Sequence, residues 1–137
     1  MDEVILARHG ESELSVVGTV NGDPAVACAL TAIGEQQARR LGERIGDVEV
    51  DLCVTSEFER VRQTADLALA GREVPRLVLP ELNDVRFGSF EGDTLADYRE
   101  WAAANEPTVV GTSRTRASPG FGASGVATAP RIPNTAL

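Results

Sequence analysis

The sequence predicts an α/β fold with a mostly parallel sheet, because short apolar runs alternate with stretches of helical periodicity. The apolar runs lie at residues 4–7, 52–55 and 77–79, and each is short enough to be a buried strand. Parallel neighbours need a crossover connection, which is usually a helix. A chain of 137 residues has room for one such domain.

The first run, Val4-Ile5-Leu6-Ala7, has no polar alternation, as expected of a strand that is covered on both faces. It stops at Arg8-His9-Gly10. Apolar residues at helical spacing then predict a helix that begins near Thr31 and ends before Gly46, a residue type favoured just after helices.

The second strand is predicted at residues 52–55 and leads into Ser56, with Glu59 three positions later. This spacing is that of a capping box at a helix start. The helix is expected to end at Gly71. Its expected apolar stripe comprises Phe58, Val61, Ala65 and Ala68.

The third strand is predicted at residues 77–79, followed by a helix that begins near Thr94. The apolar face of that helix is formed by Leu95, Tyr98 and Trp101.

Composition limits the partners. The net charge of −8 argues against nucleic acid as a partner. All thirteen basic residues are arginine, so an anion site would be built from guanidinium and backbone N–H groups.

Cys28 and Cys53 are expected to be reduced thiols. No run reaches membrane-spanning length, and Met1-Asp2-Glu3 is acidic where a signal peptide is basic, so no membrane partner and a cytoplasmic location are expected.

The chain changes character near its end. Residues 1–106 hold all 21 acidic residues and 10 arginines and are predicted to form the domain. Residues 107–137 hold three arginines and no acid, and 21 of these 31 residues are Gly, Pro, Ser, Thr or Ala. This tail is expected to be disordered, or to be encoded in an altered reading frame beginning near Val110.

Three chemically useful side chains follow the predicted strands, at the edge where ligands bind in parallel sheets. His9, the only histidine, follows the first strand, Arg60 the second and Glu81 the third. An imidazole can attack a phosphoryl group, guanidinium groups such as those of Arg8 and Arg60 can match its charge, and a carboxyl can protonate the leaving alcohol. Taken singly, each has an ordinary structural explanation, and only their joint placement favours catalysis.

Other phosphate chemistries lack their residues. There is no lysine for a Walker A loop, and neither Cys28 nor Cys53 has an arginine six positions later. One histidine without clustered carboxylates argues against a metal site. We expect neither a metal nor a cofactor.

Four ordered motifs resemble the histidine phosphatase family, also called phosphoglycerate mutase-like, over about residues 3–104. The motifs are Leu6-Ala7-Arg8-His9-Gly10-Glu11-Ser12, the segment from Leu30 to Ala38, Ser56 through Arg60 to Ala65, and Glu81 ahead of Phe87-Gly88-Ser89-Phe90-Glu91-Gly92.

The resemblance implies a three-layer α/β/α fold and a phosphohistidine at His9. By the same resemblance, Glu81 is the proton donor and four residues bind the phosphate: Arg8, Arg60, Ser12 and Ser15. Ser15 stands where many members carry asparagine. The family also implies a later strand and a second histidine, which this sequence lacks, so its version of the fold is expected to be truncated.

The resemblance leaves three functions open. The expected one is hydrolysis of a small phosphomonoester. The alternatives are a mutase-type phosphotransferase and a non-catalytic remnant that binds phosphate. The substrate and the oligomeric state are left open.

Overall fold

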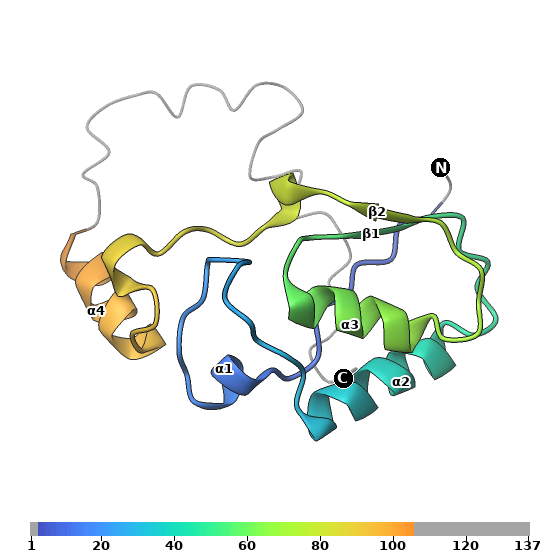
Figure 1. Ribbon diagram of the computed structural model, residues 1–137, viewed down its shortest axis with the longest axis horizontal. Coiled ribbons are helices and arrows are strands. Elements are labelled where there is room, and N and C mark those ends of the chain that lie inside the picture. The colour runs from blue at the N-terminus through green and yellow to red at the C-terminus, as the bar shows by residue number, and fades with distance from the viewer. Residues whose placement is uncertain (1–2, 106–137) are drawn as a thin grey trace.

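The computed structural model describes residues 3–105 and has the α/β architecture with a parallel sheet that the sequence predicts (Figure 1). Strand β1 (Cys53–Thr55) pairs in parallel with β2 (Arg76–Val78), with Val54 opposite Leu77. The third predicted strand is therefore confirmed, displaced by one residue. The tail predicted for residues 107–137 lies outside the described residues.

Two helices lie on one side of this sheet. Figure 1 shows α2 (Ala32–Arg44) and α3 (Glu59–Ala68) side by side beneath β1 and β2, with α3 packed on β1. The fourth helix, α4 (Leu95–Ala104), lies at the other end of the molecule. The described elements are completed by helix α1 (Glu13–Val16) and by single turns of 3-10 helix at Pro80–Leu82 and Gly88–Phe90. None of the helices in residues 3–105 is long and apolar enough to cross a membrane.

Helix α2 begins where the sequence predicts. Thr31 is its N-cap residue, and the Thr31 hydroxyl accepts a hydrogen bond of 3.0 Å from the Gly34 N–H. A Cβ atom at Gly34 would lie 1.9 Å from the carbonyl oxygen of Glu11, so only glycine lets the loop after His9 come this close to the helix. The fully buried Ala38 continues the inner face of the helix.

Helix α3 corrects two predictions. Its N-cap residue is Phe58 and no side chain caps it, so the capping box predicted from Ser56 to Glu59 is wrong. The buried residues of this helix are Arg60, Thr64 and Ala68, so polar side chains occupy much of the face that was expected to be an apolar stripe. The polar residues face the loop that carries His9, and the hydrogen bonds described below satisfy them.

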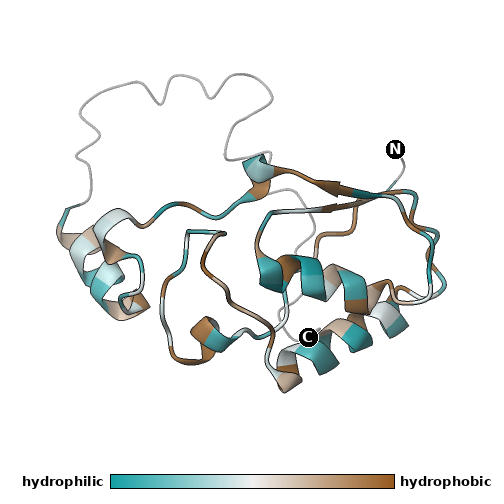
Figure 2. Ribbon diagram, in the orientation of Figure 1, coloured by the Kyte–Doolittle hydropathy of each residue, from teal (hydrophilic) through white to brown (hydrophobic). Residues whose placement is uncertain are grey.

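Residues 4–7 do not form the predicted strand. Val4, Ile5 and Leu6 are 58%, 36% and 57% exposed, whereas a strand covered on both faces was expected. A strand exists only through a neighbour's hydrogen bonds, and the one ladder among the described residues joins β1 to β2. In Figure 2 the apolar colour runs along much of β1 and β2, whereas α2 and α3 carry many polar residues.

Helix α4 begins after Thr94 as predicted, and the Thr94 hydroxyl accepts a hydrogen bond from the Asp97 N–H. This helix buries no residue. It is attached through aromatic contacts, in which the Phe87 and Tyr98 ring centroids lie 4.8 Å apart, edge to face. Residues Thr19 and Thr94 also form an antiparallel bridge. Helix α4 is therefore attached to the rest of the chain by contacts with residues of loops.

Candidate active site

The imidazole of His9 is held between one donor and one acceptor. Its Nδ1 atom lies 2.7 Å from the carbonyl oxygen of Gly10, which can only accept, so Nδ1 carries the proton. On the other side, the Nε–H of Arg60 donates to Nε2 of His9 at 3.2 Å. The two partners therefore fix the neutral tautomer in which Nε2 keeps its lone pair.

Burial lowers the pKa of His9 below its ordinary value of 6.5, and the positive charges of Arg60 and Arg8 lower it further. The hydrogen bond to the Gly10 carbonyl and the charge of Asp84 oppose this change without reversing it. At neutral pH the imidazole is therefore uncharged, which is the form that can act as a nucleophile.

Arg60 is a buried cation, only 7% exposed. Its guanidinium stacks over the Phe58 ring, 4.1 Å from the centroid, and its Nη2 donates to the carbonyl oxygen of Asn21 at 3.4 Å. Within residues 3–105, no carboxylate lies at salt-bridge distance from it. Because a buried charge without a counter-ion is unfavourable, this arrangement favours an anion as ligand.

Helix α3 fixes the loop that carries His9. The Thr64 hydroxyl accepts a hydrogen bond of 3.1 Å from the Gly10 N–H and donates one of 2.7 Å to the Arg60 carbonyl. Both bonds are buried. One side chain therefore holds the backbone on both sides of the His9–Arg60 contact.

Arg8 has an exposed side chain, although its charge acts on His9. The sequence placed both guanidinium groups at the site, and the structure brings Arg60 into contact with His9 and leaves Arg8 in solvent nearby. Arg62, two residues beyond Arg60, is also exposed. Residues two apart on a helix do not face the same way, so α3 directs one arginine inward and the other outward.

The two serines form a local turn. Ser12 is 2% exposed and is the N-cap residue of α1, while Ser15 is exposed. The Ser15 hydroxyl accepts from the Ser12 N–H and donates to the Ser12 carbonyl, both at 2.8 Å. Its donor is therefore already used, and Ser15 would have to give up that bond to reach a phosphate.

The carboxylates lie on the loop after β2. Glu81 is exposed on the turn Pro80–Leu82 and is not among the groups that shift the pKa of His9, whereas Asp84 is. Between them, Asn83 is joined to Glu57 by two hydrogen bonds, at 2.9 Å to its backbone and at 2.7 Å to its carboxylate. The loop is thus tied to the start of α3, and Asp84 is a second candidate beside Glu81 because its charge raises the pKa of His9.

Asn21 is a polar residue beside Arg60 that was not predicted from the sequence. It is 8% exposed, and its Nδ2 is buried without a hydrogen-bond partner among the described residues. Its Oδ1 accepts from the Asp23 N–H at 3.0 Å, and its carbonyl accepts from Arg60. A buried amide donor without a partner is unfavourable, so it is available to a ligand. In the sequence, Asn21-Gly22 looks like an ordinary turn, so no local signal identifies it.

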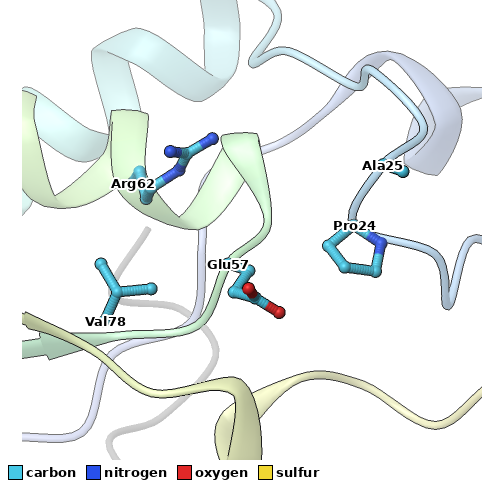
Figure 3. A pocket seen from close by; sticks show the side chains of 5 residues that line it. All are labelled: Pro24, Ala25, Glu57, Arg62 and Val78. Atoms are coloured by element: carbon cyan, nitrogen blue, oxygen red, sulfur yellow. The ribbon is translucent and has the colours of Figure 1, made fainter.

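A hollow of about 380 Å³ lies between the loop at residues 23–25, the start of α3 and the end of β2. In Figure 3, Glu57 lies between Val78 and Pro24, with Arg62 on the helix beside them. The lining residues are Pro24, Ala25, Glu57, Arg62 and Val78. Neither His9 nor Arg60 lines this hollow.

Comparison with known proteins identifies the family of this site. The sequence matches the histidine phosphatase superfamily (branch 1) over residues 4–135. The chain belongs to this superfamily. The first motifs of a histidine phosphatase are thus present, and in the described part they build a buried guanidinium against a neutral imidazole.

Individual relatives support the assignment. The chain is 43% identical over 86 residues to the adenosylcobalamin/alpha-ribazole phosphatase of Salmonella typhimurium, a match that covers 63% of this chain and 42% of the relative. The solved alpha-ribazole phosphatase of Shigella flexneri superposes with a TM-score of 0.60 at 37% identity, covering 71% of this chain and 47% of that one. YhfR of Bacillus stearothermophilus gives 0.63 at 32% identity, with 71% and 47% covered. This histidine phosphatase chain therefore spans less than half the length of these relatives.

Proposed function

We propose that this chain acts on a small phosphomonoester through a phosphohistidine at His9, and that the phosphoryl group is then transferred to water. The single observation that carries the proposal is the contact between the neutral His9 imidazole and the buried Arg60 guanidinium, which lacks a carboxylate partner in residues 3–105. A cation that is buried beside a nucleophile is suited to a phosphoryl oxygen.

In the first step, Nε2 of His9 forms a bond to phosphorus while the ester P–O bond breaks, and the leaving oxygen takes a proton from a carboxyl group. In the second step, that carboxylate removes a proton from water, the water oxygen bonds to phosphorus, and the P–N bond breaks to release phosphate and neutral His9. Arg60 and the Asn21 amide would donate to the phosphoryl oxygens, and Arg8 would add positive charge from the solvent side.

The carboxyl group is Glu81 or Asp84. The sequence predicts Glu81. Asp84 is the alternative, because its charge raises the pKa of His9 whereas Glu81 has no such effect. We favour Asp84. Two of the relatives are named alpha-ribazole phosphatase. We propose a phosphate ester of a small molecule as the substrate class of this chain too.

The test is phosphoryl transfer to His9. The chain is incubated with an isotopically labelled aryl phosphate, and protein-bound phosphate that is acid-labile and alkali-stable is measured together with free phosphate. Label on the wild-type chain and phosphate release, both absent in His9→Ala, would support the proposal.

Two other outcomes would overturn the proposal. A mutase would return the phosphoryl group to a second hydroxyl of the substrate without free phosphate. A non-catalytic remnant would remain unlabelled, and its phosphate release would equal that of His9→Ala.

A further inference from the structure

Glu91 links two segments of the candidate site through one carboxylate. Its Oε2 accepts a hydrogen bond of 2.8 Å from the Gly22 N–H, and its Oε1 accepts one of 2.9 Å from the Phe87 N–H. Hydrogen bonds from backbone N–H groups to a charged acceptor are among the strong ones in proteins. A single side chain therefore holds together two segments that are distant in the sequence. Gly22 and Glu91 are 69 residues apart.

The two segments also touch backbone to backbone. A Cβ atom at Gly22 would lie 2.0 Å from the Val85 carbonyl oxygen and 2.8 Å from Oε1 of Glu91, so nothing larger than glycine fits there. The contact continues beyond Glu91, because the Val20 N–H donates to the Asp93 carbonyl at 2.9 Å. The position of one segment therefore determines that of the other.

Each linked segment carries a polar group of the site next to its attachment point. Asn21 precedes Gly22; its carbonyl contacts Arg60, and its Nδ2 has no hydrogen-bond partner among residues 3–105. Asp84, whose charge acts on His9, precedes Val85. We propose that Glu91 is a positioning residue: its carboxylate holds the Asn21 amide and the Asp84 carboxyl in register around a phosphate at His9. This inference rests on the proposed function and deepens it.

Charge and position predict opposite effects at Glu91. A carboxylate near a phosphate repels it, so if charge alone mattered, neutralising Glu91 would tighten phosphate binding. If position matters, Glu91→Gln weakens binding, because the amide NH₂ faces an N–H donor and one of the two hydrogen bonds is lost. The sign of the change therefore separates the two explanations.

The lone histidine provides the measurement. Inorganic phosphate is titrated into the wild-type chain, and the dissociation constant is read from the imidazole NMR signals of His9. We expect Glu91→Gln to weaken binding about tenfold, since small displacements in such sites are costly. The matched control is Asp23→Asn, which removes the same charge. It also removes the partly exposed ion pair of 3.0 Å between Asp23 and Arg86, which joins the same two segments. The control should change the constant by about twofold or less, as expected of an exposed pair.

Equal or tighter binding by Glu91→Gln would overturn the proposal, and so would a loss of the same size in Asp23→Asn. If Glu91→Gln fails to fold, Glu91→Asp replaces it, because this variant keeps the charge but is too short to reach both N–H groups; wild-type affinity in that variant would equally overturn the proposal. A wild-type chain whose His9 signals ignore phosphate would instead refute the proposed function itself.

Discussion

The two sides of the His9 site are held in different ways. On the α3 side, Arg60 and Thr64 are buried and bond directly to His9 and to the Gly10 backbone. On the other side, Glu81 and Asp84 are exposed and are held through their neighbours, Asn83 on Glu57 and Phe87 on Glu91. The side that would bind the anion is thus preorganised by packing, whereas the side that would handle protons depends on a loop and on two carboxylates that anchor it.

The largest expected effect is on the proton-handling side. In Asp84→Asn, hydrolysis of an alkyl phosphate should fall by about a hundredfold to ten-thousandfold, the usual contribution of a general acid. An aryl phosphate whose leaving group needs no proton should lose much less. The ratio of the two rates is the measurement, and Glu81→Gln is the matched control. A selective loss of alkyl phosphate hydrolysis in Glu81→Gln alone would transfer the role to Glu81.

A second comparison uses two arginines on the same helix. Arg60→Met should weaken phosphate binding at His9 by about a hundredfold, because it removes the buried cation. Arg62→Met removes an exposed guanidinium two residues away and should change binding by about twofold or less. The dissociation constant for phosphate is measured for both variants by isothermal titration calorimetry. Equal losses would show that α3 attracts phosphate by its general charge and that burial contributes little.

The sequence predicted the features that depend on neighbours in the chain. Thr31 and Thr94 begin their helices as predicted, because an N-cap is a contact between residues three apart. Arg60 lies against His9, but the reasoning that placed it there holds only in part: Arg60 follows β1, whereas residues 4–7 before His9 form no strand. The capping box at Ser56 was not formed. Ser56 is buried, at 5% exposure, in the segment between β1 and α3, and the helix begins only at Glu59; the burial of a residue depends on distant segments, which local spacing does not reveal.

The features that depend on distant segments were not predictable. Residues 4–7 have the composition of a strand, yet a strand also needs a neighbour to pair with, and composition does not supply one. Asp84 and Glu81 are three residues apart in one loop, and spacing does not say which of them acts on His9. Likewise, the hydrogen bond from Gly22 to Glu91 spans 69 residues and leaves no local pattern.

The smallest expected effect is a change in the titration of His9. Because burial and the charges of Arg60 and Arg8 lower its pKa, an NMR titration should give a value below 6.5 in the wild-type chain. Arg60→Met removes one of these charges and the hydrogen bond to Nε2, so the pKa should rise in that variant.

The lowered pKa of His9 also predicts how the free energy of unfolding depends on pH. The unfolded chain binds a proton at His9 near pH 6.5, while the folded chain does so only at lower pH. The free energy of unfolding should therefore decrease as the pH falls from about 6.5 through the folded pKa, and His9→Gln should lack this component. Urea unfolding at several pH values tests it. A His9 pKa above 6.5 in the wild-type chain would mean that the hydrogen bond to Gly10 and the charge of Asp84 together outweigh burial and the two arginines, and the anion-binding side would then not keep His9 neutral.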